Sequence, residues 1–222
     1  MKPWETLATA QTPDGTELVL RRHDGDYVIR ADGYDLMVSR MHGSEQEMAR
    51  LACPSLAPGA EVLVGGLGMG YTLRALLDIL PADGIATVGE LIPEIVEWNR
   101  SPLGALAGNP LEDPRTRVEM GDVGRLIRNS RGRFDAILLD VDNGPEAFTQ
   151  RGNSSLYSPG GLDSAWQALK PHGAFAVWST GPAVAFEAKL RRAGFNSEVH
   201  RVSARGINKG PMHAVYVGRR RG

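Results

Sequence analysis

Three glycines at alternate positions, Gly66, Gly68 and Gly70, follow a short apolar segment at 61–65 and precede a helix-like segment at 70–80. Glycine lets the backbone bend sharply and approach a ligand closely. The first turn of the helix that follows presents unpaired N–H groups. A phosphate-binding P-loop needs a lysine directly after the last glycine, and none stands there. The pattern therefore predicts a strand, a tight turn and a helix, with space for a ligand at the turn.

The spacing of these glycines separates two kinds of nucleotide-binding turn. The dinucleotide fingerprint is G-x-G-x-x-G. The three glycines here follow G-x-G-x-G, which is typical of folds that bind S-adenosylmethionine. A tight turn without any ligand is the remaining interpretation.

Two acidic residues end or follow the next two predicted strands. Glu90 ends the strand at 85–89, roughly 20 residues after the glycine turn, where a carboxylate can accept both hydroxyls of a ribose. Asp122 follows the strand at 117–120, where it can accept the amino group of adenine or cap the next helix. Together with the glycines, they predict a nucleoside site at the carboxyl ends of the strands.

Strand and helix patterns alternate from residue 61 onward. This alternation predicts an α/β fold with a Rossmann-like, doubly wound and mostly parallel sheet. The last two strand-like segments, 197–202 and 213–218, leave no room for a helix between them and predict an antiparallel hairpin at one edge. The other strands are expected at 61–65, 85–89, 117–120, 135–140 and 174–178.

The first 56 residues have a different pattern. Short β-prone segments at 17–21, 27–30 and 34–39 are separated by Asp-Gly turns and predict a small antiparallel β-segment. A helix should follow, opened by a capping box of Ser44 and Glu47. We expect two units: residues 1–56, the β-segment with its helix, and residues 57–222, the nucleoside-binding catalytic domain.

Composition excludes several classes of protein. The 25 Lys and Arg against 26 Asp and Glu give a net charge of −1, which argues against nucleic acid as a partner. No apolar run approaches the ~20 residues that span a bilayer, so we expect no membrane association. The N-terminus lacks a signal-peptide pattern, and the single cysteine, Cys53, forms no internal disulfide. Scattered histidines predict no metal site, and we expect a cytoplasmic protein.

Asp140 ends the fourth predicted strand opposite the glycine turn, and Asp142 lies two residues further on. Paired carboxylates attract a cationic amine, and one of them can orient the amine and accept its proton. The sequence therefore predicts Asp140 and Asp142 as catalytic residues for a small amine substrate. Ordinary turn chemistry is the alternative for Asp142.

The order of these motifs resembles the spermidine synthase (polyamine aminopropyltransferase) family, within the S-adenosylmethionine-dependent methyltransferase-like fold. The resemblance implies a transferase, usually a homodimer, that binds decarboxylated S-adenosylmethionine or its product methylthioadenosine. The motifs that carry it are the glycine turn with Leu73-Arg74, the segments 32–37 and 45–48, Glu90 to Glu94, Gly121-Asp122, Asp140 to Pro145, and Leu156-Tyr157.

The resemblance also implies roles for individual residues. The glycine turn, Glu90 and Asp122 would bind the cofactor, with Glu90 at the ribose and Asp122 at the adenine. Asp140 would lie at the transferred alkyl group. The substrate-side residues would be Glu45, Gln46 and Tyr157.

Three departures from the family pattern keep other functions open. Leu67 and Met69 stand where the family has an aspartate for the aminopropyl amine, Glu45 replaces a tyrosine, and the loop after Asp140 is two residues shorter. The alternatives are a methyltransferase that uses S-adenosylmethionine and releases S-adenosylhomocysteine, and a non-catalytic nucleoside-binding protein.

Overall fold

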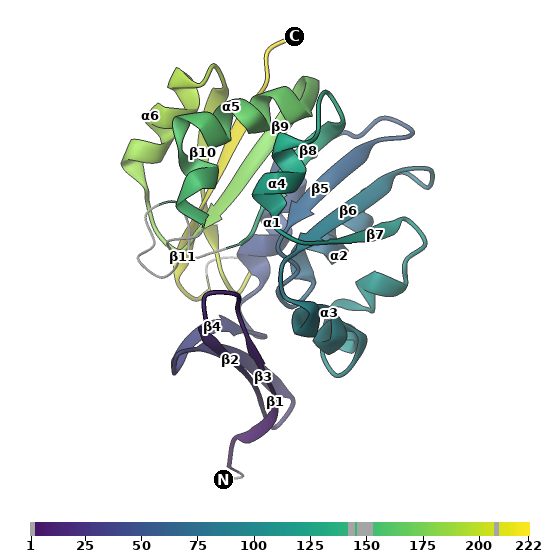
Figure 1. Ribbon diagram of the computed structural model, residues 1–222, viewed down its shortest axis with the longest axis vertical. Coiled ribbons are helices and arrows are strands. Elements are labelled where there is room, and N and C mark those ends of the chain that lie inside the picture. Colours follow the sequence, from purple (N-terminus) through teal and green to yellow (C-terminus); the bar gives the residue numbers. More distant parts are fainter. Residues whose placement is uncertain (1–2, 142–144, 146–152, 207–208) are drawn as a thin grey trace.

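The computed structural model describes residues 3–141, 145, 153–206 and 209–222. The predicted catalytic residue Asp142 lies outside these residues. The chain forms a small sheet near the N-terminus and a larger sheet covered by helices (Figure 1).

The N-terminal sheet is antiparallel, with the strand order β1-β2-β3-β4. Two-residue Asp-Gly turns join β2 to β3 and β3 to β4, and all four turn residues have positive φ (47° at Asp24 and Asp32, 87° at Gly25, 84° at Gly33). Such turns match the twist of a hairpin, which is why this spacing predicted short antiparallel strands. The strands are β1 (Glu5–Gln11), β2 (Glu17–His23), β3 (Asp26–Ala31) and β4 (Tyr34–Val38).

The large sheet has seven strands in the order β10-β11-β9-β8-β5-β6-β7. All neighbours are parallel except β11, which runs antiparallel to both β9 and β10. The predicted doubly wound fold with an antiparallel edge hairpin is confirmed. The strands are β5 (Glu61–Gly65), β6 (Ile85–Glu90), β7 (Thr116–Met120), β8 (Phe134–Leu139), β9 (Leu169–Ser179), β10 (Asn196–Ser203) and β11 (Met212–Arg219).

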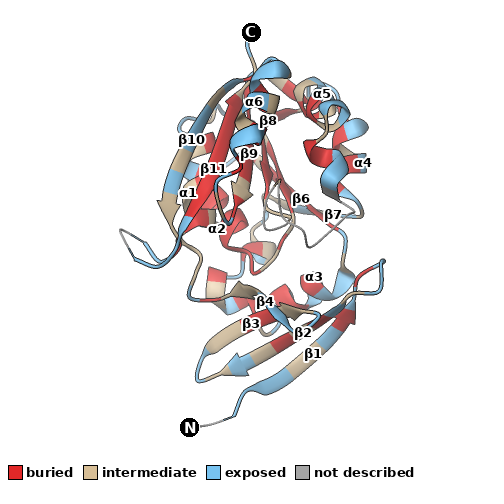
Figure 2. Cartoon of the chain, turned by 90° about the vertical axis from the view of Figure 1, so that its left-hand side faces the viewer, coloured by how far each residue is buried: buried red, intermediate tan, exposed pale blue. Residues whose placement is uncertain are grey.

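Helices cover both faces of this sheet. Val62 and Val64 face the helices α1, α2 and α3, whereas Leu63 faces α4, α5 and α6, as the two-residue period of a strand requires. Figure 2 shows buried residues concentrated in the strands between these two layers. The helices are α1 (Gly43–Ala52), α2 (Tyr71–Leu77), α3 (Pro93–Arg100), α4 (Val123–Arg128), α5 (Pro159–Ala168) and α6 (Val184–Arg192), with 3₁₀ turns η1 (Gly104–Ala107), η2 (Pro110–Glu112) and η3 (Asn153–Tyr157). Within the described ranges, no helix is long and apolar enough to cross a membrane.

The capping box predicted at the start of α1 is wrong. The N-cap is His42, with no side-chain capping bond, and Ser44 lies inside the first turn with its side chain fully buried. Its hydroxyl has partners in β9 and β11 instead of a backbone N–H of its own helix. Glu47 pairs with Arg50 on the outer side of the helix.

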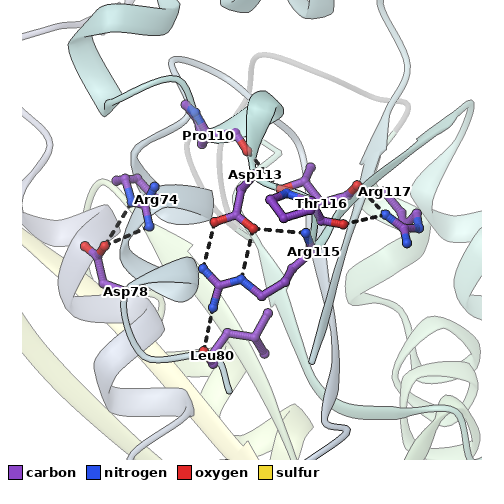
Figure 3. A network of polar contacts seen from close by, with 9 residues as sticks. Arg74, Asp78, Leu80, Pro110, Asp113, Arg115, Thr116 and Arg117 are labelled. Carbon is purple, nitrogen blue, oxygen red and sulfur yellow. Dashed lines mark hydrogen bonds and ion pairs between the residues drawn. The ribbon is translucent and has the colours of Figure 1, made fainter. Parts of the chain in front are cut away.

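A mostly buried ion pair fixes the segment before β7 against the turn that follows α2 (Figure 3). Arg115 donates to both carboxylate oxygens of Asp113, with N···O distances of 2.9 and 2.7 Å. Its third contact is a 2.6 Å bond to the carbonyl of Leu80. These contacts fix the segment just before β7 to the turn that precedes β6.

Candidate active site

The glycine turn lies against the end of β8. Gly66 has a φ of 86°, and a Cβ at this position would lie 2.5 Å from the carbonyl oxygen of Asp140. Only glycine fits both the backbone conformation and this close approach. Gly68 lies against Met37 of the N-terminal sheet, and Gly70, with a φ of 82°, is the N-cap of α2. The turn thus brings the end of β5 and the residue after β8 together, at the point where the strand order of the sheet reverses.

Glu90 ends β6 with its side chain directed at the glycine turn. Its Oε2 accepts a 2.9 Å bond from the N–H of Leu67, and its Oε1 accepts bonds from the N–H groups of Leu91 and Ile92. Burial raises the pKa of Glu90, and these three bonds oppose that rise. Because Oε2 accepts only one of them, it keeps a lone pair for a ligand hydroxyl.

Asp122 performs the first of the two functions that the sequence left open, helix capping. It is the N-cap of α4, where Oδ1 accepts a 2.7 Å bond from the N–H of Gly124. Its Oδ2 lies 3.6 Å from Arg128, and the side chain is 54% exposed. Asp122 also lines the same cavity as Glu90. Capping therefore occupies Oδ1, and Oδ2 lies beside Arg128 without a hydrogen bond to the cap.

The first cavity lies over the carboxyl ends of β5, β6 and β7. It occupies about 730 Å³, its open mouth included, and brings Glu90 and Asp122 together with Gly66, Gly68 and Asp140. Its other wall comes from the N-terminal sheet, through Thr12, Leu18, Ile29, Leu36 and Met37. The sequence placed no site residue in this sheet, because nothing in its alternating pattern shows which face will cover another unit.

Asp140 stands between this cavity and a second one and lines both. Thr72 of α2 donates a 2.7 Å bond to its Oδ2. Removal from water raises the pKa of Asp140 to about 6, and the Thr72 bond opposes the rise. Asp140 is therefore held in place and ionised at neutral pH.

The second cavity lies between α1, α2 and the ends of β9 and β11. Glu45 faces it, and burial together with the charge of Asp140 raises the pKa of Glu45 to about 8. Tyr71 also lines it, with its ring stacked on His42 at 4.2 Å. The carboxyl groups of Asp140, with a pKa of about 6, and Glu45, with a pKa of about 8, thus share a cavity suited to a cationic ligand.

Two predicted substrate residues lie elsewhere. Gln46, the next residue along α1 after Glu45, does not line either cavity. Tyr157 is buried on the opposite face of the sheet, with its ring edge-on to Phe186 at 5.7 Å.

The sequence reasoning missed two residues that line the second cavity and one, Ser44, that lies behind them. Ser44 Oγ lies 2.7 Å from Glu45 Oε2, 2.8 Å from His213 Nδ1 and 2.9 Å from Trp178 Nε1. Trp178 and His213 line the cavity. One signal was available: the spacing of Ala174, Ala176 and Trp178 puts Trp178 on the sheet face that α1 covers.

No family model matches the chain. The polyamine aminopropyltransferase of Bacillus subtilis is 28% identical over 186 residues, which cover 82% of this chain and 64% of that protein. Polyamine aminopropyltransferase 1 of Streptomyces coelicolor is 31% identical over 137 residues, covering 60% of this chain and 24% of that protein. The chain thus spans less than two thirds of the length of these curated relatives.

Solved structures give the same picture of the fold. The crystal structure of spermidine synthase from Thermotoga maritima superposes with a TM-score of 0.74 over 96% of this chain and 72% of that one, at 20% identity. A spermidine synthase in complex with the transition state analogue AdoDATO gives the same values. The fold is therefore of the methyltransferase-like, Rossmann-like class. Within that class, the sequence relatives confirm the predicted resemblance to the spermidine synthase family.

Proposed function

We propose that this chain transfers an aminopropyl group from decarboxylated S-adenosylmethionine to an amine. The observation that carries the proposal is the place of Asp140, an anchored carboxylate that lines both the nucleoside cavity and the acidic second cavity. A group bound across both cavities would have its reacting carbon at this carboxylate.

The residues of the first cavity fit an adenosine. Oε2 of Glu90 has a lone pair for the ribose hydroxyls, and Oδ2 of Asp122 is free of the capping bond and can accept the adenine amino group. The apolar side chains of Ile92 and Val123 supply surface for the base. Gly66 and Gly68 leave the backbone open to close approach.

The bound sulfonium supplies an electrophilic carbon whose leaving group is a neutral thioether. The work left to the protein is mostly positioning. An aliphatic amine has a pKa near ~10 and reaches the site as an ammonium ion. Asp140 attracts and orients this ion. After the nitrogen has lost one proton, its lone pair can attack the reacting carbon, and Asp140 stabilises the positive charge that the nitrogen carries after transfer.

The second cavity favours a decarboxylated cofactor. The carboxyl groups of Glu45 and Asp140 attract an ammonium group, but they repel the carboxylate that S-adenosylmethionine carries. The relatives named polyamine aminopropyltransferases support the same choice over methyl transfer.

Turnover tests this proposal. Decarboxylated S-adenosylmethionine and putrescine should yield methylthioadenosine, and Asp140→Asn should lower kcat by about 100-fold or more while methylthioadenosine still binds within a few-fold of wild type. No methylthioadenosine from any aliphatic diamine would contradict the proposal. Tighter calorimetric binding of S-adenosylmethionine than of its decarboxylated form would favour methyl transfer instead.

Several finer points remain predictions from the sequence. They are a homodimeric state, a cytoplasmic location, and substrate contacts made by Gln46, Tyr157 and Asp142.

A further inference from the structure

A chain of short polar contacts runs from the second cavity into the wall between α1 and β11. It begins at Glu45 Oε2, passes through Ser44 Oγ, and ends at His213 Nδ1, with steps of 2.7 and 2.8 Å. Ser44 and His213 are 169 residues apart in the sequence. The ring of His213 packs edge-on against Trp178 at 4.8 Å.

The number of available protons restricts which atoms in this chain can donate and which can accept. The indole N–H of Trp178 can only donate, so Ser44 Oγ accepts from it. The single hydroxyl proton of Ser44 then goes either to Glu45 or to His213. When Glu45 is ionised, Ser44 donates to it and His213 must carry its proton on Nδ1. When Glu45 is protonated, it can donate to Ser44, and Ser44 donates to an Nδ1 that carries no proton.

We propose that Glu45, Ser44 and His213 form a proton-transfer chain that takes the proton of the amine acceptor out of the second cavity. This inference rests on the proposed function. Glu45 is the catalytic residue, because it faces the cavity, and Ser44 and His213 are positioning residues that act through it.

The acceptor nitrogen gives one proton to Glu45 and uses the freed electron pair to form the new N–C bond. The C–S bond of the sulfonium breaks, and its electron pair stays on sulfur as a neutral thioether. Because His213 carries its proton on Nδ1 while Glu45 is ionised, the ring first exchanges that proton with solvent for one on Nε2, which frees Nδ1 to accept from Ser44. Glu45 then passes its proton to Ser44 Oγ while Ser44 passes its own proton to His213 Nδ1. His213 then loses the Nε2 proton to solvent.

The charges around Glu45 support this assignment. The titratable groups that share its cavity are Asp35 from β4, Tyr71 from α2, Asp140 after β8 and His213 from β11. Burial and Asp140 raise the pKa of Glu45 to about 8, closer to that of an amine than the value of about 6 for Asp140. Burial lowers the pKa of His213, which favours rapid release of a proton that the ring receives.

Two measurements test the chain. The first is kcat/KM with decarboxylated S-adenosylmethionine and putrescine as a function of pH. In the wild type, the rate should rise as Glu45 ionises near pH 8. Glu45→Gln should lower kcat by about 10-fold or more and move this rise to the lower pKa of Asp140. Glu47→Gln, on the same helix but paired with Arg50, is the matched control and should leave the profile unchanged.

The second measurement needs no turnover. Nitrogen-15 NMR of the His213 ring should show the Nε2–H tautomer below the pKa of Glu45 and the Nδ1–H tautomer above it. Glu45→Gln and Ser44→Ala should each abolish this exchange. The inference is overturned if the His213 tautomer still changes with pH in both variants, or if Glu45→Gln leaves the rate profile unchanged. A wild type that releases no methylthioadenosine contradicts the proposed function instead, and the ring spectra still decide whether the chain shares a proton.

Discussion

Thr72 donates a 2.7 Å hydrogen bond to Asp140 Oδ2 and so joins the first turn of α2 to the end of β8. The same helix begins at Gly70, the last glycine of the turn. The segment that shapes the nucleoside cavity therefore also holds the carboxylate at its far wall.

Replacing Thr72 by valine should impair catalysis more than folding. The Thr72 bond keeps the pKa of Asp140 lower than burial alone would set it, so its loss raises that pKa above about 6. Thr72→Val alone should lower kcat/KM by roughly 10-fold, as for loss of one bond to a charged group. Combined with Glu45→Gln, in which Asp140 sets the acid side of the rate profile, Thr72→Val should also move that side to higher pH. The matched control is Thr87→Val in β6: Thr87 is also fully buried, and its hydroxyl has no partner among the described residues. An equal effect of both substitutions would contradict the role of Thr72.

Two substitutions of Asp122 separate its two functions. Asp122→Ala removes the helix cap and should cost about 1 kcal/mol of unfolding free energy. Asp122→Asn keeps an oxygen for the Gly124 N–H, but it then presents an NH₂ donor to the amino group of adenine. Calorimetry should show methylthioadenosine binding weakened by roughly 10-fold in Asp122→Asn, with unfolding by urea nearly unchanged. Wild-type affinity in Asp122→Asn would mean that Asp122 only caps α4.

Gly66→Ala should disrupt the site itself. The added Cβ would meet the Asp140 carbonyl at 2.5 Å in a backbone with a φ of 86°. We expect methylthioadenosine affinity to fall by at least about 10-fold. Gly132→Ala is the control, because Gly132 also has a positive φ, 56°, but has open space around its Cβ position. It should cost about 1 kcal/mol of unfolding free energy and leave nucleoside binding intact.

The pair of Asp113 and Arg115 predicts how stability depends on pH. Hydrogen bonds from Arg115 lower the pKa of Asp113 from 3.8 to about 2. The stabilisation that Asp113 gives the folded state is therefore complete above its pKa in the unfolded chain, and it is lost as the pH falls through the folded-state pKa of about 2. We expect up to about 2 kcal/mol from this group. Unfolding in urea should show that Asp113→Asn is less stable than the wild type at neutral pH and lacks this dependence on acid pH. The control is Asp78→Asn: because the Asp78 side chain is 59% exposed, this substitution should change the free energy of unfolding by less than about 0.5 kcal/mol. An unaltered acid dependence in Asp113→Asn would refute the assignment.

Much of the fold could be predicted because its signals are local. The apolar run that became β5, the glycine turn and the Asp-Gly hairpins depend on residues next to one another, and the observed bounds differ from the predicted ones mainly at the ends. Strand β9 starts at Leu169, earlier than expected, because Leu169 already pairs with Phe134 of β8. The register then shifts, so the Pro-His-Gly segment lies in the strand without a regular partner in β8.

The rest of the site depends on contacts between distant segments. Ser44 reads as a helix cap by itself, and only its burial against Trp178 and His213, 134 and 169 residues away, shows its partners. Met37 likewise becomes a wall of the nucleoside cavity because the N-terminal sheet packs over the glycine turn. No periodicity in one segment reports which surface will cover it.

A crystal structure with bound methylthioadenosine tests the central claim most directly. The account predicts the ribose hydroxyls on Glu90, the adenine amino group on Asp122, and the sulfur at Asp140 facing the second cavity. A nucleoside bound elsewhere, or bound in this cavity with Glu90 and Asp122 out of contact with it, would contradict the account.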